Sequence, residues 1–358
     1  MEIQEAQLPP DWVVDVAGGC AVVRPASPPS GPVPDGQVRV EVESSSVNGS
    51  DARLRRSRPA ARTTPGLEFA GTVIATGAGV DLWGPGDRIM GLHTGTFASH
   101  LDVPAATCVR VPDAVDQLVA GCLLEVFTTA HDALLTTAKL CSGDRLLVNG
   151  AAGGVGTAAV QLAGLLGAKV SATAWDASTH ERLTRLLGPG GTVITSPMDL
   201  EAGGFFDVVL ELVSGANLGV ALEFMAERGR IVVIGSGAQD NAVLNLRTLR
   251  QRRVVLTGST LKDRSSLERG EAVRAAADLV IPALLDDAIE VPIEGVYPGT
   301  RIDAAFDRFD AGGVRQDRVG VRADLTVGAH DPRRRSPPHP TMDRRARSTR
   351  CGTQWQSA

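Results

Sequence analysis

The amino-acid sequence predicts an α/β protein in which a doubly wound parallel sheet is joined to a β-rich domain. Residues 144–176 have the pattern of a strand, a glycine-rich turn, a helix and a second strand. From there strands and helices alternate to about residue 262, whereas the first 122 residues contain short strands separated by glycine and proline. The chain has 358 residues, 43% of them hydrophobic, which is enough for two domains.

The central unit begins with an apolar run at Leu146, Leu147 and Val148, which is typical of a buried strand. Residues 149–154 form a turn with few side chains, and apolar residues then recur every three or four positions, as in a helix. Gly167 ends this helix, and residues 168–174 are predicted to form the next strand.

A turn of this kind suits a diphosphate, because the first N–H groups of a helix and its dipole attract an anion. The dinucleotide pattern GxGxxG is present with alanine first, as Ala151-x-Gly153-x-x-Gly156. A Cβ at Gly153 or Gly156 would block the approach of the ligand or the packing of the helix on the strand. The alternative is a tight turn between strand and helix that binds no ligand.

The alternation of strands and helices extends over residues 123–262, which include the central unit. After the central unit, HERLTRLLG is a predicted helix, GGTVITS and FDVVLELVSG are predicted strands, and LGVALEFMAERG is a predicted helix ending at Gly229. Ligands of doubly wound sheets bind beyond the carboxyl ends of the strands, so Gly235, Ser236 and the turn that begins at Val213 are expected to face a cofactor. Helix capping and turn geometry are the alternative explanation for these glycines.

The segments on either side complete the predicted organisation. Residues 1–122 form the first part of the β-rich domain, with a strand at residues 37–47 followed by SSSVNGSDARLRRS, which leads into a loop. Residues 263–326 are predicted to return to that domain. Residues 327–358 are rich in arginine, proline and serine without periodicity, and are predicted to be a disordered, solvated tail.

Composition excludes several function classes. The net charge of −5 gives no basic field for nucleic acid, and no apolar run reaches the length of a membrane span. The N-terminus lacks the apolar core of a signal peptide, and the five cysteines show no CxxC spacing. We therefore expect a cytoplasmic protein that binds neither membrane nor nucleic acid.

Several motifs together resemble the medium-chain dehydrogenase/reductase superfamily. They are VNGSD, PGLEFAGTV, GDRIMGL, NGAAGGVGTAAVQLAGLLGAKV and TGSTL, and the similarity covers about residues 30–320. Within the superfamily the chain is most similar to the zinc-independent quinone oxidoreductases, a branch that includes the enoyl reductase domains of polyketide synthases. The resemblance implies a split GroES-like catalytic domain around a Rossmann domain, and a homodimer.

The resemblance also bears on metal. Zinc-dependent members have a cysteine and a histidine where this chain has Asn48 and Leu67. The histidines His93, His100 and His131 show no ligand spacing, and catalytic zinc needs three protein ligands. We therefore expect no metal site.

Site residues follow from the same resemblance. Asn48 is expected near the nicotinamide and substrate, and Thr129 beside the nicotinamide. The remaining positions that it implies hold the diphosphate or line the nicotinamide pocket: Gly153, Gly154, Val155, Gly156, Gly235 and Leu261. A tyrosine that many relatives carry five residues after the asparagine is Arg53 here.

The expected activity is hydride transfer from a reduced nicotinamide to a conjugated carbon–carbon double bond in an enone or enoyl thioester, or to a quinone. Such a reaction needs donors to the developing enolate oxygen, and Asn48 suits that role. Arg53, or water, is the candidate for charge stabilisation or for the proton. Arg53 can equally be a solvated cation of the Arg55, Arg56 and Arg58 run.

The cofactor is expected to be NADPH, with NADH left open. The second strand ends in Ala172, Thr173 and Ala174, without a carboxylate at its tip, as in NADPH-using relatives, although Asp176 has the spacing of an NAD-ribose ligand. Arg182 is the candidate for the 2′-phosphate, and an exposed helix position explains it as well. A rival hypothesis is a protein that binds the dinucleotide without turnover, as a scaffold in a biosynthetic assembly. Metal-dependent alcohol dehydrogenation is disfavoured by Asn48 and Leu67.

Overall fold

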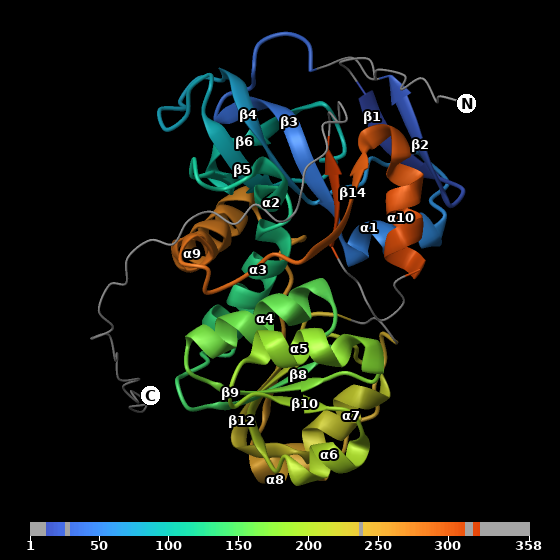
Figure 1. Ribbon diagram of the computed structural model, residues 1–358, viewed down its shortest axis with the longest axis vertical. Helices are drawn as coiled ribbons and strands as arrows, with labels where there is room; N and C mark the ends of the chain where they lie inside the picture. Colours follow the sequence, from blue (N-terminus) through green and yellow to red (C-terminus); the bar gives the residue numbers. More distant parts are fainter. Residues whose placement is uncertain (1–11, 26–28, 236–238, 312–317, 323–358) are drawn as a thin grey trace. The chain divides into compact units, whose positions relative to one another are not determined.

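The structure is a computed structural model that describes residues 12–25, 29–235, 239–311 and 318–322. Over these residues the chain forms a six-stranded parallel sheet, a seven-stranded largely antiparallel sheet and a small hairpin, with helices packed on both large sheets (Figure 1). The predicted α/β fold class is confirmed. Ser236 and the predicted tail at residues 327–358 lie outside the described residues.

The parallel sheet has the strand order β10-β9-β8-β11-β12-β13, and every neighbouring pair in it is parallel. Its strands are β8 (Arg145–Asn149), β9 (Lys169–Thr173), β10 (Thr192–Ile194), β11 (Phe206–Glu211), β12 (Met225–Val233) and β13 (Val255–Gly258). The connecting helices are α4 (Gly154–Leu165), α5 (His180–Leu187), α6 (Pro197–Ala202), α7 (Ala216–Glu223) and α8 (Leu246–Arg252), with a 3₁₀ turn at Ala177–Thr179. The order reverses between β8 and β11, so the glycine turn after β8 lies at the switch point where ligands of such sheets bind.

The second sheet joins segments from both ends of the chain in the order β14-β15-β3-β4-β5-β7, with β6 paired to β3. Its strands are β3 (Gln37–Val47), β4 (Glu68–Thr76), β5 (Arg88–Leu92), β6 (His100–Pro104), β7 (Cys108–Arg110), β14 (Ile293–Pro298) and β15 (Arg318–Arg322). The hairpin is β1 (Trp12–Ala17) with β2 (Cys20–Pro25), and the short helices α2 (Gln117–Ala120) and α10 (Ile302–Ala311) accompany this part, with 3₁₀ turns at Ala105–Thr107 and Gly299–Arg301. Strand β15 pairs with β3 although the two are far apart in sequence, as Val319 opposite Val47 shows.

One helix prediction was wrong at its end. The helix expected to reach Gly229 is α7, which stops at Glu223, and strand β12 begins two residues later at Met225. Apolar residues such as Leu222 and Met225 fit a helical spacing as well as a strand. Pairing of β12 with β11 on one side and β13 on the other decides the matter, because the ladder satisfies its backbone groups.

The segment expected to be a loop after residue 47 is instead a helix, α1 (Gly49–Ser57). Asn48 is its N-cap, and the Asp51 carboxylate accepts a 2.9 Å hydrogen bond from the Asn48 backbone N–H, as in a capping box. Arginines Arg55 and Arg56 in the last turn complement the helix dipole. The helix could not be predicted from periodicity, because its sequence is polar and its serines and arginines show no repeat of apolar residues.

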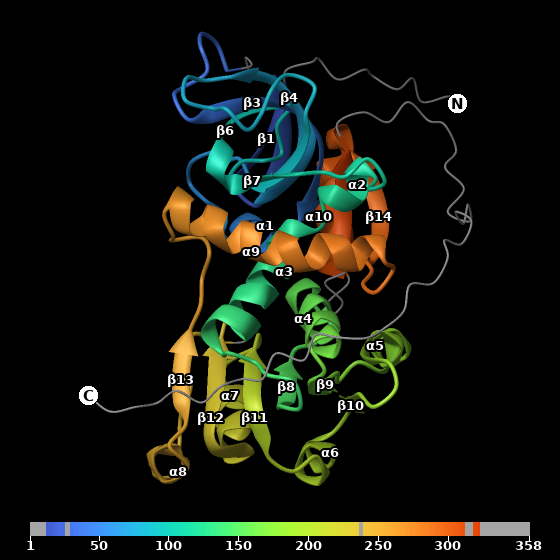
Figure 2. The same ribbon diagram turned by 90° about the vertical axis from the view of Figure 1, so that its left-hand side faces the viewer.

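Two helices connect the two sheets. Helix α3 (Leu124–His131), which continues as a π-helix at Asp132–Thr137, packs on both α4 and α9 (Ser266–Leu285) (Figures 1 and 2). Helix α9 also lies against the 3₁₀ turn at Ala105–Thr107, where the Cβ of any larger residue at Gly270 would come within 2.2 Å of the Ala106 carbonyl oxygen. Among the described residues, no helix combines the length and the apolar character that crossing a membrane requires.

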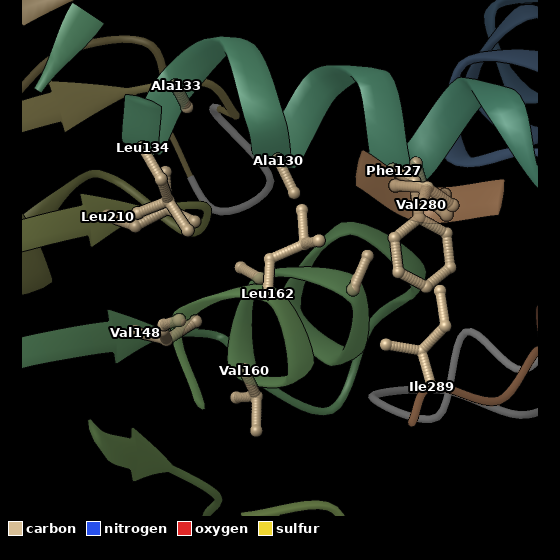
Figure 3. Close-up of a cluster of buried hydrophobic side chains, with 14 of the residues drawn as sticks. Phe127, Ala130, Ala133, Leu134, Val148, Val160, Leu162, Leu210, Val280 and Ile289 are labelled. Atoms are coloured by element: carbon tan, nitrogen blue, oxygen red, sulfur yellow. The ribbon is translucent and has the colours of Figure 1, made fainter. Parts of the chain in front are cut away.

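The largest hydrophobic core spans these contacts (Figure 3). Leu162 on α4 is fully buried, and it lies below Ala130 of α3 and near Val148 of β8. At the other end of the same cluster, Phe127 packs near Val280 of α9. This core therefore fixes the helix that begins at the glycine turn against the helix that carries Thr129.

Replacing Leu162 by alanine is expected to lower the free energy of unfolding by about 2–5 kcal/mol, because a methylene-rich side chain is lost from a packed interior. Leu165 lies on the same helix but is 40% exposed, so Leu165→Ala serves as the matched control and is expected to cost about 1 kcal/mol or less. Urea unfolding followed by circular dichroism measures both. Equal losses would show that α4 is not anchored through Leu162.

Candidate active site

Two adjoining cavities lie beside the glycine turn. The larger has a volume of about 400 Å³, and the smaller a volume of about 130 Å³. Both are lined by Ser50, Glu125, Thr129 and Ile234, so they adjoin at these residues, and the two together are called the cleft. The larger part is reached by residues of α1, α3, the glycine turn and the ends of β11 and β12.

The glycine turn presents bare backbone to the larger cavity. Helix α4 begins with Gly153 as its N-cap, has no side-chain cap and has no acidic residue in its first turn. Its first N–H groups and its positive dipole end are therefore available to an anion. A Cβ at Gly156 would stand 2.6 Å from both the Cα of Ala151 and the carbonyl oxygen of Gly150. Gly156 thus serves the close packing of helix on turn.

A buried network beneath the turn fixes its shape. Glu211 at the end of β11 is fully buried, and its carboxylate accepts hydrogen bonds from the Asn149 side chain and from the backbone N–H groups of Val213 and Ser214, at 2.7–2.8 Å. The Thr173 hydroxyl donates to Asn149 Oδ1 at 2.8 Å and accepts from the Gly150 N–H at 3.0 Å. The ends of three neighbouring strands are therefore tied together behind the cavity wall.

A second buried carboxylate organises the opposite wall. Glu68 is 1% exposed. One of its oxygens accepts from the Ser46 hydroxyl and, at 3.1 Å, from Asn48 Nδ2, and the other accepts from the Glu125 backbone N–H at 2.9 Å. Asn48 Nδ2 also lies 3.1 Å from Ser46 Oγ. Both N–H groups of the Asn48 side chain thus have partners within the protein.

Two further acids stand near Glu68, and their pKa values are raised. Burial raises the pKa of Asp51 to about 7, against hydrogen bonds from the backbone N–H groups of Gly66 and Asn48. Burial also raises the pKa of Glu125 to about 8, and the charges of Glu68 and Asp51 add to this effect. At neutral pH Glu125 therefore carries a proton while it faces the cavity.

Arg53 is the arginine of α1 that reaches the larger cavity. Arg55 pairs with Asp307, and Arg56 pairs with Asp310. Within the described part of the chain the Arg53 side chain has no hydrogen bond or ion pair, and it is exposed at the cavity. Its neighbours thus hold α1 against α10, while Arg53 lines the larger cavity.

The smaller cavity has apolar and cationic walls. Leu67, Leu92 and Leu261 contribute apolar surface, and Lys262 and Arg269 contribute positive charge. The loop that carries Leu261 is fixed by an ion pair between Asp132, which is 1% exposed, and Arg264 at 2.6 Å.

Ten of the predicted site residues line this cleft. Nine are at the larger cavity and one, Leu261, at the smaller; the nine are Asn48, Arg53, Thr129, Gly153, Gly154, Val155, Gly156, Val213 and Gly235. Thr173 does not line it, because its hydroxyl is used inside the network below the turn. Arg182 does not line it either, since it donates to the Ala152 carbonyl oxygen at 2.9 Å and pairs with Glu294 at 3.5 Å.

Three residues of the site escaped sequence reasoning. Ser50 and Glu125 line both cavities, and Glu68 joins their two walls through hydrogen bonds. Glu125 is the second residue of a helix whose other residues are mostly apolar. A charged residue on an apolar helix is the signal from which Glu125 could have been identified. Nothing in the spacing of Glu68 reveals that two distant segments meet at its oxygens.

The donor set does not fit a metal ion. Within the described residues, no three histidine, cysteine, aspartate or glutamate side chains are grouped so that they could hold one. Asn48 donates its N–H groups to Glu68 and Ser46, and Leu67 offers no ligand atom. The two positions that hold zinc ligands in zinc-dependent relatives therefore supply no ligand here.

Comparison with family models assigns both parts of the chain. Residues 34–113 match the alcohol dehydrogenase GroES-like domain, and residues 154–280 match the zinc-binding dehydrogenase domain. The chain belongs to the medium-chain dehydrogenase/reductase superfamily. The word zinc in the name of the second family model describes the family as a whole. The superfamily resemblance found in the sequence is confirmed.

Among curated relatives in the superfamily, the chain is 36% identical over 237 residues to the erythronolide synthase EryA2 of Saccharopolyspora erythraea, covering 64% of this chain and 6% of the synthase. It is 27% identical over 301 residues to the highly reducing polyketide synthase frbB of Dothideomycetidae sp., covering 81% of this chain and 11% of that protein. The chain therefore spans only a small part of the length of these relatives.

Solved structures of similar size also match. A mycobacterial protein, Rv1454c, complexed with NADPH is 25% identical with a TM-score of 0.75, covering 87% of this chain and 99% of that one. An alcohol dehydrogenase superfamily protein from Novosphingobium aromaticivorans is 26% identical with a TM-score of 0.76, covering 88% and 100%. The CurK enoyl reductase, 24% identical with a TM-score of 0.74 and coverage of 88% and 99%, shares the fold.

Gly156→Ala is expected to weaken dinucleotide binding at least about tenfold, because the new Cβ meets backbone that cannot move without reshaping the phosphate-binding turn. Gly164→Ala is the matched control on the same helix, where a Cβ meets nothing within 4 Å. It is expected to leave binding unchanged and to raise stability by up to about 1 kcal/mol. Isothermal titration with NADPH and NADH measures the binding, and unchanged affinity of Gly156→Ala would contradict this role of the turn.

Glu125 makes stability depend on pH. Its pKa is about 8 in the folded protein, against the ordinary glutamate value of 4.5 that applies in the unfolded chain, so the folded state binds more protons between these values. The free energy of unfolding should therefore fall as pH rises from about 4.5 to about 8, relative to Glu125→Gln, which removes this contribution. Urea unfolding at several pH values measures the difference. Glu271→Gln, an exposed change on α9, is the control, and parallel curves for wild type and Glu125→Gln would contradict the expectation.

Proposed function

We propose that this protein is a zinc-independent, NADPH-dependent reductase that saturates a carbon–carbon double bond conjugated to a carbonyl, in an enoyl thioester or enone, or reduces a quinone. The observation that carries the proposal is the single cleft in which a bare helix N-terminus at Gly153–Gly156 adjoins the walls formed by α1 and Glu125. The similarity to polyketide synthases and to an NADPH-bound relative supports it.

The residues at the larger cavity fit a dinucleotide. The N–H groups at the start of α4 would hold the diphosphate, and Gly154 permits its approach because no side chain stands at that position. Thr129, Val213 and Gly235 would line the nicotinamide end. When bound, the reduced dinucleotide supplies the hydride, and the protein aligns it and excludes water.

NADPH is proposed over NADH because β9 ends at Thr173 without a free carboxylate at its tip. The Asp176 carboxylate, which has the spacing of a ribose ligand, accepts the Ser178 N–H at 2.9 Å as the cap of a short 3₁₀ turn. Arg182 lies beside the glycine turn through its bond to the Ala152 carbonyl. To bind a 2′-phosphate its guanidinium would exchange the 3.5 Å contact with Glu294 for a doubly charged oxygen cluster.

Donors to the substrate oxygen come from the start of α1. Ser50 lines both cavities and Gly49 lines the larger one, so the Ser50 hydroxyl and the first N–H groups of α1 are the proposed donors. An enolate oxygen placed there gains from these donors and from the helix dipole. Asn48 lines the same wall, but its N–H groups already bind Glu68 and Ser46, so its proposed role is to hold the start of α1 in place.

The deciding experiment is oxidation of NADPH and NADH by the purified protein with crotonyl-CoA, an enone and 9,10-phenanthrenequinone as acceptors, followed by absorbance. Turnover with NADPH and lower efficiency with NADH are expected. Tighter binding and faster turnover with NADH would overturn the cofactor assignment. Binding of NADPH without turnover of any acceptor would favour a protein that binds the dinucleotide without catalysis.

Ser50→Ala is expected to lower kcat about tenfold or more while the dissociation constant for NADPH stays within about twofold, because an oxyanion donor acts mainly in the transition state. Ser57→Ala is the matched control at the other end of α1, where the hydroxyl bonds to the Leu54 carbonyl. It should change neither constant. A raised KM with unchanged kcat for Ser50→Ala would show that Ser50 binds substrate without stabilising the transition state.

A further inference from the structure

Glu125 occupies the junction of the cleft. It is the second residue of α3, and it lines both the larger cavity beside the glycine turn and the smaller cavity with apolar walls. A substrate that extends from the nicotinamide end into the smaller cavity must therefore pass this side chain. Ser50, Thr129 and Ile234 share the junction, and none of them has a group that is both acidic and protonated at neutral pH.

The main chain of Glu125 is clamped while its carboxyl group is not. The backbone N–H donates to Glu68 at 2.9 Å, and the backbone carbonyl accepts from the Thr129 hydroxyl at 2.7 Å. Within the described residues the carboxyl group itself takes part in no hydrogen bond. The backbone of Glu125 is thus fixed by two hydrogen bonds, while its carboxyl group has no hydrogen-bond partner among the described residues.

The surroundings keep a proton on this group. The Ser46 hydroxyl, the Asn48 side-chain amide and the Glu125 backbone N–H all donate to the Glu68 carboxylate. These donors therefore do not stabilise a negative charge on the Glu125 carboxyl group, which lies near the charge of Glu68. Burial is the largest cause of its raised pKa of about 8, and Arg269 acts in the opposite direction. Among the described residues, the charged and titratable groups that act on it or line a cavity with it are Asp51 and Arg53 of α1, Glu68 of β4, His93 after β5, Lys262 of the loop before α9, and Arg269 of α9.

Other proton donors are less well placed. Tyr297 is the sole tyrosine of the chain and lines neither cavity. His93 lines the smaller cavity, but burial lowers its pKa and its Nδ1 contacts the Thr94 carbonyl at 2.6 Å. Arginine side chains are not deprotonated in proteins, so an arginine at the cavity is not a proton donor. These facts leave Glu125 as the neutral acid beside the reacting groups.

We propose that Glu125 is the catalytic acid that protonates the α-carbon of an enoyl thioester or enone after its β-carbon has received the hydride. This inference rests on the proposed function. The hydride and the proton together add one H₂ equivalent across the double bond, a new C–H bond forms at each carbon, and the O–H bond of Glu125 breaks. The resulting carboxylate recovers its proton from water. Quinones receive their protons on oxygen, which exchanges with water directly, and do not need this acid.

The test compares wild type with Glu125→Gln in D₂O, using NADPH with crotonyl-CoA and with 9,10-phenanthrenequinone. For crotonyl-CoA, kcat is expected to fall about 100-fold or more, and by a much larger factor than kcat for quinone reduction. The small remaining product should carry deuterium on both faces of the α-carbon, because water replaces a fixed donor. In wild type the deuterium should be on one face.

Two further measurements separate an acid from a structural role. The wild-type kcat for crotonyl-CoA should decline at alkaline pH as the acid ionises. The same alkaline decline in kcat should be seen for Glu125→Asp and should be absent for Glu125→Gln. In the protein without ligands, the infrared difference between wild type and Glu125→Gln should show a protonated carboxyl group at pH 7.

The outcomes are distinct. If wild type reduces no acceptor, the proposed function fails and this inference fails with it. If wild type reduces crotonyl-CoA and Glu125→Gln keeps both its rate and its one-faced deuteration, only the inference is overturned. An ionised Glu125 at pH 7 in the infrared spectrum overturns it as well.

Discussion

The site depends on one buried carboxylate, that of Glu68. It accepts hydrogen bonds from Ser46, from the Asn48 side chain and from the Glu125 backbone, and so joins β3, the start of α1 and the start of α3. A buried charge needs such partners, because leaving any of them unmade costs several kcal/mol. Satisfying Glu68 in this way fixes two cavity walls and leaves Glu125 beside a negative charge, which adds to the effect of burial in keeping the proton on Glu125.

The parallel sheet uses the same device on the other wall. Glu211 at the end of β11 is fully buried and accepts from Asn149 and from two backbone N–H groups, which holds the turn after β11 against the glycine turn after β8. Because this network holds the glycine turn in place from behind, the face of the turn at the cavity needs no side chains to stabilise it. A rigid base and a bare surface together are what a diphosphate site requires.

Helix α3 couples these two walls through packing. It lies against α4, which begins at the glycine turn, and against α9, which packs on the antiparallel part. Thr129 and Glu125 are one turn apart on α3 and are joined by the bond from the Thr129 hydroxyl to the Glu125 carbonyl. A single helix thus carries two residues that line both cavities, and its burial makes their spacing constant.

The fold class, the glycine turn and nine of the residues that line the larger cavity could be predicted from sequence or from the family resemblance, because strand–turn–helix periodicity and glycine spacing are local properties. The end of α7 was misplaced and α1 was missed, since apolar spacing near Met225 fits a strand as well as a helix and a polar helix has no periodic signal. The three-dimensional structure was needed to show that Thr173 and Arg182 are used inside the protein and that Ser50 and Glu125 face the cleft. Hydrogen-bond partners distant in sequence decide which side chains remain free, and no local pattern records them.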